Sequence, residues 1–194
     1  MTNINSVCVY CGSSSKGRGS HHDAARRLGA LLAKRDVRLI FGGGRVGLMG
    51  ILADAVLAAG GEVTGVIPDF LEEREVGHSS CTELVITDSM HSRKQRMAEL
   101  SDGFVILPGG LGTLDETFEI VTWRQLGLHD KPIVVVDIDG YWRPLEALID
   151  NMIAENYVRA EHRSLFHMVG SIEEVLPTLE ALQPEATHID SELI

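Results

Sequence analysis

The sequence predicts an α/β fold of the Rossmann-like type, in which a doubly wound, mainly parallel sheet carries helices on both faces. Three observations support this prediction. Segments rich in Val, Ile and Leu recur along the chain, segments with helical periodicity separate them, and several of the apolar segments are apolar throughout. Strands without polar alternation are typical of a parallel sheet that helices cover on both sides.

The apolar segments rich in β-branched residues are predicted to be strands: SVCVY (6–10), VRLIF (37–41), EVTGVI (62–67), ELVIT (83–87), GFVIL (103–107) and PIVVV (132–136). The segments between them have apolar residues at helical spacing, which predicts helices over 20–35, 48–60, 89–101, 113–127 and 141–156. LFHMV (165–169) is either a short last strand or part of a connection. A final helix is expected from Ser171, a good N-cap residue, to about Ala181.

The length of 194 residues suits one domain with a substantial core, and the chain has no internal repeat and no low-complexity linker. We therefore expect a single Rossmann-like domain over residues 1–182. The polar residues 183–194 are expected to form a flexible tail.

The formal net charge of -11 argues against a nucleic-acid or membrane-surface partner, because both need a basic face on the protein. No segment approaches the roughly 20 apolar residues of a membrane span, and we expect a cytoplasmic protein. The chain has 3 cysteines, too few for a disulfide scaffold. Cys8 and Cys11 form a C-x-x-C, but a zinc site would need two more ligands. The favoured interpretation is that Cys8 lies in a strand and Cys11 where that strand ends.

Two glycine-rich loops follow predicted strands, where ligands bind in this fold class. FGGGRVGLMG (41–50) contains a G-x-G-x-x-G pattern at Gly42, Gly44 and Gly47, and Asp69 ends the next strand, as in dinucleotide-binding sites. A dinucleotide-binding oxidoreductase is therefore one alternative. Against it, the loop follows the second strand instead of the first, no hydride-transfer constellation accompanies it, and a tight turn alone would need the same glycines.

LPGGLGT (107–113) also joins a strand to a helix. Its glycines allow several backbone N–H groups to point inward, and the start of the helix adds partial positive charge, so the loop is suited to a phosphate. Thr113 can contribute a hydroxyl. Of the acids that follow, Asp115 and Glu119 are interpreted as first-turn residues that complement the helix dipole. Glu116 is expected to stay ionised there and to act as a base or to stabilise a cation.

TDSMHSRKQRMAEL (87–100) is expected to begin a helix, with Asp88 or Ser89 as its N-cap. Spacings of three and four put four of its residues on one stripe: Met90, Arg93, Lys94 and Met97. A stripe that mixes methionines with cations is unusual for a solvated face. The preceding strand ends at the same edge of the sheet as the Pro-Gly-Gly loop, which makes Arg93 a candidate site residue.

MHSRK (90–94) together with PGGLGTLDE (108–116) resembles the paired signature of the LOG family, the cytokinin riboside 5'-monophosphate phosphoribohydrolases, often labelled lysine decarboxylases. The similarity extends over about residues 6–170. It implies a homodimer that hydrolyses the N-glycosidic bond of AMP, or of an N6-substituted AMP, to a free base and ribose 5-phosphate, without a metal or cofactor. Nothing in the sequence supports the pyridoxal phosphate chemistry of a decarboxylase.

The resemblance implies that Arg93 and Glu116 are the catalytic pair. The expected contacts to the nucleoside monophosphate are Gly43, Gly44, Glu75, Met90, Lys94, Gly109, Gly110, Leu111, Gly112, Thr113, Leu114, Asp115 and Thr122. Leu111 stands where plant members often carry Tyr, and the preferred N6 substituent stays open. The remaining alternative is a non-catalytic nucleotide-binding protein, which would bind AMP without cleaving it.

Overall fold

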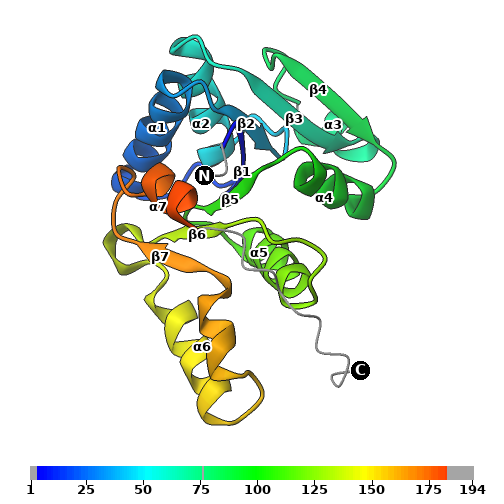
Figure 1. Ribbon diagram of the computed structural model, residues 1–194. Helices are drawn as coiled ribbons and strands as arrows, with labels where there is room; N and C mark the ends of the chain where they lie inside the picture. Colours follow the sequence, from blue (N-terminus) through cyan, green and yellow to red (C-terminus); the bar gives the residue numbers. More distant parts are fainter. Residues whose placement is uncertain (1–3, 76, 183–194) are drawn as a thin grey trace.

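The computed structural model describes residues 4–75 and 77–182, with the backbone alone for 73–75. These residues form a seven-stranded sheet in the order β4-β3-β2-β1-β5-β6-β7, and all of its pairings are parallel (Figure 1). The predicted fold class is confirmed. The expected tail, 183–194, lies outside the described residues. The strands are β1 (Ser6–Tyr10), β2 (Arg38–Phe41), β3 (Val63–Pro68), β4 (Glu83–Thr87), β5 (Gly103–Ile106), β6 (Ile133–Val136) and β7 (His167–Val169).

The connections between the strands are mainly helical, as predicted. The helices are α1 (Gly19–Lys34), α2 (Gly47–Ala58), α3 (Asp69–Glu75), α4 (Met90–Glu99), α5 (Leu111–Gln125), α6 (Arg143–Ala154) and α7 (Val175–Ala181), with the 3-10 helices η1 (Ile138–Gly140) and η2 (Ala160–Leu165). The sequence did not predict α3, because seven residues are too few to establish a helical period.

The prediction that Ser171 is the N-cap of the last helix is wrong. The helix α7 begins at Val175, and the Ser171 hydroxyl donates a hydrogen bond to the Glu174 carboxylate. Pro177 falls in the first turn of α7, where its missing N–H costs no helical hydrogen bond. The helix therefore starts close to this proline.

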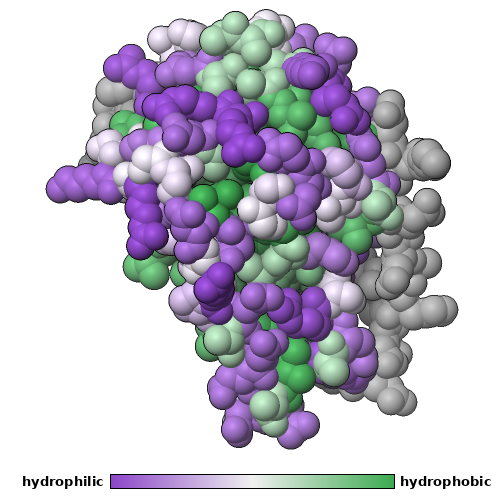
Figure 2. All heavy atoms as spheres, turned by 90° about the vertical axis from the view of Figure 1, so that its left-hand side faces the viewer, coloured by the Kyte–Doolittle hydropathy of each residue, from purple (hydrophilic) through white to green (hydrophobic). Residues whose placement is uncertain are grey.

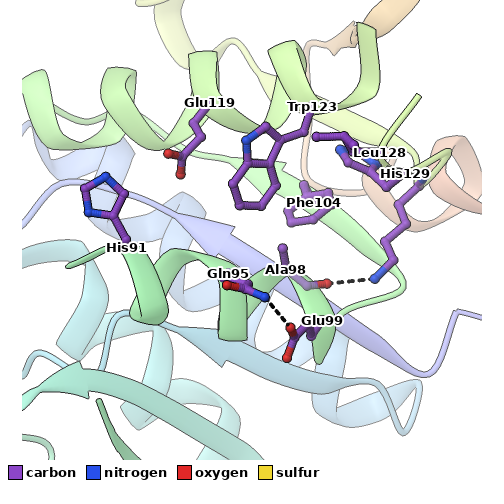
Figure 3. A pocket seen from close by; sticks show the side chains of 10 residues that line it. His91, Gln95, Ala98, Glu99, Phe104, Glu119, Trp123, Leu128 and His129 are labelled. Atoms are coloured by element: carbon purple, nitrogen blue, oxygen red, sulfur yellow. Dashed lines mark hydrogen bonds between the residues drawn. The ribbon is translucent and has the colours of Figure 1, made fainter. Parts of the chain in front are cut away.

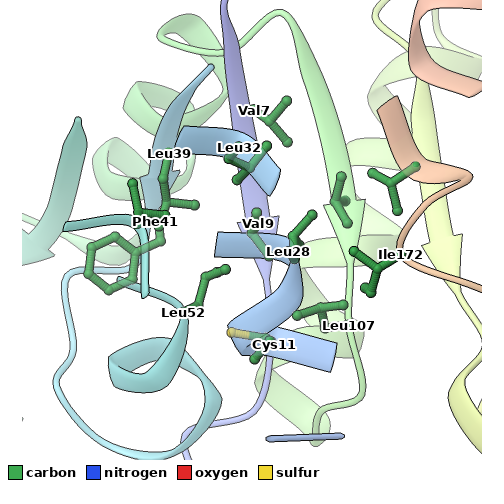
Figure 4. Close-up of a cluster of buried hydrophobic side chains, with 14 of the residues drawn as sticks. Val7, Val9, Cys11, Leu28, Leu32, Leu39, Phe41, Leu52, Leu107 and Ile172 are labelled. Atoms are coloured by element: carbon green, nitrogen blue, oxygen red, sulfur yellow. The ribbon is translucent and has the colours of Figure 1, made fainter. Parts of the chain in front are cut away.

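Two apolar clusters cover the two faces of the sheet. Figure 4 shows the first cluster, in which Val7 and Val9 of β1 meet Leu28 of α1 and Leu52 of α2. The alternate β1 residues, Cys8 among them, point to the second cluster, which α4, α5 and α6 cover. This division follows from the alternation of side chains along a strand. The face at the left of Figure 1 is mostly hydrophilic at its surface, with apolar side chains in separate groups (Figure 2).

Cys8 and Cys11 are both buried and free. They belong to different apolar clusters on opposite faces of the sheet. The interpretation of Cys8 as a strand residue and of Cys11 as the residue after the strand is confirmed.

The strand order reverses at β1, which lies between β2 and β5. In doubly wound sheets the crevice for ligands opens at such a switch point, beyond the carboxyl ends of the strands. The loops after β1 and β5 touch here, since the Gly12 N–H donates a 3.0 Å hydrogen bond to the Pro108 carbonyl. The start of α2 joins them, because the Leu48 N–H donates to the Gly12 carbonyl at 2.9 Å.

Candidate active site

The helix α4 carries Arg93 to this edge of the sheet. Ser89 is its N-cap and forms a reciprocal capping box with Ser92, which decides between the two N-cap residues that the sequence allowed. The predicted stripe is confirmed, since Arg93, Lys94 and Met97 are all buried. A buried guanidinium needs partners for its N–H groups, and these partners fix its position.

The partners of Arg93 come from the strand β3 and from the loop after β2. Its Nε donates to the Val66 carbonyl of β3 at 3.1 Å, and its Nη2 donates to the Gly42 carbonyl, after β2, at 3.0 Å. Its Nη1 lies 3.7 Å from the Met90 sulfur. The guanidinium is thus anchored at the carboxyl ends of two strands.

The glycine loop after β2 makes room for this arginine. A Cβ atom on Gly42 would lie 1.9 Å from Nη2 of Arg93. Gly47 has a φ of 68° and approaches Ser13 so closely that a Cβ atom there would lie 2.4 Å from the Ser13 carbonyl carbon. Gly42 and Gly47 of the G-x-G-x-x-G pattern are therefore explained by contacts within the protein. This loop also follows β2 instead of the strand at the switch point, which weakens the dinucleotide-binding alternative.

The structure also places Gly43, Gly44 and Asp69, which the sequence made candidates for contacts with a ligand. Gly43 and Gly44 are buried; the Gly43 carbonyl accepts from the His78 N–H at 2.9 Å, and Gly44 bridges to Gly77. Asp69 begins α3, where its carboxylate accepts from the Phe70 N–H at 2.6 Å. The two glycines and the Asp69 carboxylate therefore all contact the backbone of the protein itself.

Glu116 of α5 faces Arg93. One carboxylate oxygen lies 4.0 Å from Arg93 Nη2, and the Glu116 side chain is 13% exposed. Burial raises the pKa of Glu116 to about 7, against the positive charge of Arg93, which lowers it. The expectation that Glu116 stays fully ionised was wrong, because burial outweighs the neighbouring cation. Near neutral pH both protonation states are populated.

Lys94, next to Arg93, joins α4 to α5. Its amine lies 3.1 Å from an Asp115 oxygen and 3.0 Å from a Glu119 oxygen. Burial works to lower the pKa of Lys94, but the hydrogen bonds and charges of Glu119 and Asp115 outweigh it, so that the pKa is raised. The Lys94 ammonium is therefore paired with two carboxylates.

This pairing corrects the interpretation of the two acids. The helix α5 begins at Leu111, two residues earlier than expected, and its first turn contains no acidic residue. Asp115 and Glu119 lie beyond that turn. Their partner is the Lys94 amine on the neighbouring helix, instead of the dipole of their own helix.

The start of α5 presents backbone N–H groups without a side-chain cap. Its N-cap is Gly110, and no side chain accepts a hydrogen bond there. Gly110 and Gly112 are exposed, and a Cβ atom on either would meet nothing within 4 Å. Thr113 is buried against Gly109, where a Cβ atom would lie 2.0 Å from the Thr113 hydroxyl oxygen. The first backbone N–H groups of α5 therefore have no side-chain acceptor, and such a helix start is suited to an anion.

The remaining candidate contacts are more dispersed. Leu111, at the start of α5, is 86% exposed, and Leu114 packs partly against the second apolar cluster. Thr122 is exposed in the last turns of α5, away from the start of that helix. Glu75 ends α3, and its side chain lies outside the described part of the chain.

A cavity of about 460 Å³ between α4 and α5 was not predicted (Figure 3). Trp123 and Phe104 point into it, and His91 and Glu119 lie at one end. The sequence signal for it was the apolar and aromatic content of the second half of α5, which a core face would equally explain.

A second cavity, of about 420 Å³, lies at the switch point between the loops after β1 and β5. Lys16, Arg18 and His21 line it together with Gly109 and Gly110. The exposed loop 12–18 has no periodicity that would have drawn attention to it.

Among the residues that the structure describes, no group of three or more His, Cys, Asp or Glu side chains is placed to hold a metal ion. Within the same residues, no helix combines the length and the apolar composition that crossing a bilayer requires.

Comparison with known proteins gives relatives along almost the whole chain. The profile of a family described as "Possible lysine decarboxylase" matches residues 49–179. A probable cytokinin riboside 5'-monophosphate phosphoribohydrolase of Oryza sativa subsp. japonica, LOGL1, is 44% identical over 90% of this chain and 78% of its own. Cytokinin riboside 5'-monophosphate phosphoribohydrolase LOG5 of Arabidopsis thaliana is 42% identical over 92% and 78%.

Solved structures share the fold at lower identity. The molybdenum cofactor carrier protein of Chlamydomonas reinhardtii superimposes with a TM-score of 0.72 and 19% identity, covering 93% of this chain and 98% of that chain. At this identity the likeness concerns the fold alone. The matches in sequence go further: this chain belongs to the LOG family of cytokinin riboside 5'-monophosphate phosphoribohydrolases, whose profile carries the description of possible lysine decarboxylases.

Proposed function

We propose that the protein hydrolyses the N-glycosidic bond of a nucleoside 5'-monophosphate, AMP or an N6-substituted AMP, and releases the free base and ribose 5-phosphate. The observation that carries this proposal is the pair of the buried Arg93 and the largely buried Glu116, 4.0 Å apart, beside the uncapped start of α5. The names of the relatives, phosphoribohydrolases acting on cytokinin riboside 5'-monophosphates, agree with it.

In this proposal the phosphate binds at the start of α5 and the ribose lies against Glu116. Breaking the bond between the base nitrogen and the anomeric carbon leaves the electron pair on the base and positive charge on the sugar. A fixed carboxylate stabilises that charge. Water then bonds to the anomeric carbon, and its proton passes to Glu116, whose pKa of about 7 suits a base at neutral pH. The departing base takes up one proton to become the free base, and Glu116 returns to the carboxylate when it gives up the proton that it received, so that the sugar gains the hydroxyl of the water and the base gains a proton.

Arg93 acts on Glu116 and on the departing base. Its Nε and Nη2 are fixed by two carbonyls, so the guanidinium cannot follow a moving carboxylate. A fixed cation orients the Glu116 carboxylate and stabilises the negative charge that develops on the base. Arg93 and Glu116 are therefore the proposed catalytic residues, and the loop from Gly109 to Thr113 is the proposed phosphate-binding segment.

We also propose that the protein is a homodimer that acts in the cytoplasm. Leu126 and Leu128, which follow α5, are 53% and 67% exposed, and Leu128 lines the cavity between α4 and α5. Large exposed apolar side chains beside an apolar cavity favour a protein partner. The cysteines Cys8, Cys11 and Cys81 are free, as expected in a reducing compartment. Sedimentation of the wild type and of a Leu128→Lys variant tests the dimer.

The test of the activity is chromatography after incubation with AMP and, separately, with isopentenyl-AMP, with Glu116→Gln as the control. Base released by the wild type alone supports the proposal, and the ratio of the two rates identifies the preferred substituent. Binding of AMP without release by either form would indicate a non-catalytic nucleotide-binding protein. Binding of NAD without any base release would favour the dinucleotide-binding alternative.

A further inference from the structure

A buried histidine lies outside the set of residues that the proposed mechanism uses. His78 follows α3 and is 2% exposed. Its Nε2 lies 2.9 Å from a carboxylate oxygen of Asp54 on α2, whose side chain is 72% exposed. An ionised carboxylate only accepts hydrogen bonds, so Nε2 of the ring carries the hydrogen and donates it. The imidazole therefore ties the segment 77–82 to the helix α2.

His78 contacts the residues on both sides of Gly42. Its ring stands edge-on to the ring of Phe41, with the centroids 6.4 Å apart. Its backbone N–H donates a 2.9 Å hydrogen bond to the Gly43 carbonyl. Gly42 lies between these two residues, and its carbonyl accepts the 3.0 Å hydrogen bond from Nη2 of Arg93. His78 thus holds the backbone on either side of the carbonyl that anchors the arginine.

The strand β3 confines the same loop from the other side. A Cβ atom on Gly43 would lie 3.1 Å from a side chain of β3 and 3.5 Å from the backbone of Val66. The Val66 carbonyl is the second anchor of Arg93, through its Nε. The loop after β2 is therefore packed between His78 and β3, and both carbonyls that fix the guanidinium belong to this packed layer.

The histidine is a costly choice for packing alone. Nδ1 of His78 is buried and has no hydrogen-bond partner among the residues that the structure describes. A buried polar atom without a partner destabilises a folded protein. An apolar side chain of similar size would fill the same space without that cost. What the histidine adds is the hydrogen bond from Nε2 to Asp54, which fixes the orientation of the ring.

We infer that His78 and Asp54 form a clamp that positions Arg93 for the proposed reaction. His78 is a positioning residue in this scheme, because it acts through Gly42 and touches no part of the nucleotide. The inference rests on the proposed function and deepens it, since it extends the site to a layer behind the arginine. Misplacing a catalytic group by about 1 Å lowers a rate by up to about a hundredfold, so the clamp affects kcat.

The first variant is Asp54→Ala, which releases the ring and places no new atom in the core. Asp23→Ala is the matched control, because Asp23 lies on α1 with a side chain that is 69% exposed and also has one ion-pair partner. Both are assayed for release of base from AMP. We expect kcat of Asp54→Ala to fall about tenfold with KM nearly unchanged, whereas the control should behave as the wild type does.

Replacing the histidine separates its hydrogen bond from its packing. His78→Leu keeps an apolar side chain of similar size and removes the donor, whereas His78→Gln keeps an amide N–H in reach of Asp54. We expect His78→Leu to lose kcat about tenfold or more and His78→Gln to recover part of it. Thermal unfolding should show His78→Leu at least as stable as the wild type, because the unpaired Nδ1 is gone. A purely structural role predicts instead that activity follows stability.

The carboxyl ¹³C NMR signal of Glu116, identified by its absence in Glu116→Gln, reports the position of Arg93 without an activity assay. The positive charge of Arg93 lowers the pKa of Glu116, so a displaced guanidinium should move the titration of this signal to higher pH in Asp54→Ala. The substitution alters none of the other charged groups that act on this carboxylate: Lys94, Asp115 and Glu119.

The outcomes distinguish the clamp from the proposed function. Base release at the wild-type kcat and an unchanged titration of Glu116 in Asp54→Ala and His78→Leu would overturn the inference and leave the hydrolase standing. A shifted titration in a protein whose wild type releases no base would support the clamp and refute the hydrolase. Activity that falls together with the unfolding temperature, while the titration stays unchanged, would show a structural role and would also overturn the inference.

Discussion

The guanidinium of Arg93 and the carboxylate of Glu116 lie 4.0 Å apart, although their helices follow strands at different places in the sheet. The helix α4 follows the edge strand β4, and α5 follows β5, with three strands between them. The pair forms because α4 packs over β3, where Arg93 binds the Val66 carbonyl. The site therefore depends on how the helix α4 packs on the sheet.

Replacing Glu116 by Gln should abolish most of the base release while the fold is kept. The substitution removes the charge at nearly constant shape, and loss of a carboxylate in this position is expected to lower kcat by about a hundredfold or more. Glu99→Gln, on the exposed side of α4, is the matched control. Turnover of Glu116→Gln close to that of the wild type would refute the proposed mechanism.

The same variant should be more stable than the wild type above pH 7. The folded-state pKa of Glu116 is about 7, above its ordinary value of 4.5, so the folded protein binds more protons than the unfolded chain between these values. The contribution of this group to the free energy of unfolding therefore falls as pH rises through that window, by up to about 3 kcal/mol. The side chain of Gln does not ionise, so it makes no such pH-dependent contribution to the free energy of unfolding.

Urea unfolding of both forms measures this difference. The free energy of unfolding of Glu116→Gln should exceed that of the wild type by about 1 to 3 kcal/mol near pH 8, and the gap should narrow toward about pH 5. A gap that stays constant with pH would mean that Glu116 has an ordinary pKa.

Much of the fold could be predicted from the sequence, because each strand is a local apolar segment and the stripe on α4 is a local pattern. The partners of Arg93 could not, since Val66 and Gly42 are 27 and 51 residues away along the chain. The pairing of Lys94 with Asp115 and Glu119 depends on the register between two helices. The raised pKa of Glu116 follows from its burial, which is a property of the tertiary structure.

Lys94→Met should shift the pH dependence of catalysis. The positive charge of Lys94 lowers the pKa of Glu116, whereas the charges of Asp115 and Glu119 raise it. Without the amine, the acid limb of kcat/KM against pH, expected near pH 7 in the wild type, should move to higher pH. Lys34→Met, on the surface of α1, is the control. An unchanged limb together with reduced activity would indicate that Lys94 contacts the substrate directly.

Gly42→Ala tests the anchoring of Arg93 without altering a catalytic group. The new Cβ atom would lie 1.9 Å from Arg93 Nη2, so the guanidinium must leave the Gly42 carbonyl and change its distance to Glu116. A displacement of this size is expected to lower kcat/KM by about tenfold to a hundredfold. Gly170→Ala, where the nearest atom lies at 4.0 Å, should leave activity unchanged. Full activity in Gly42→Ala would mean that the position of Arg93 is not critical.

Gly110→Val separates phosphate binding from folding. A Cβ atom on Gly110 meets no atom within 4 Å, so the larger side chain projects into the open space at the start of α5 and strains nothing in the protein. Its φ of -102° is one that valine adopts. The variant should therefore unfold at the temperature of the wild type while its KM for AMP rises about tenfold or more, because the added methyl groups occupy the place of the phosphate.

In Gly109→Ala, by contrast, the Cβ atom would lie 2.0 Å from the Thr113 hydroxyl, and stability should fall together with activity. Thermal unfolding and AMP kinetics of the two variants distinguish these effects. An unchanged KM in a folded Gly110→Val would place the phosphate elsewhere than at the start of α5.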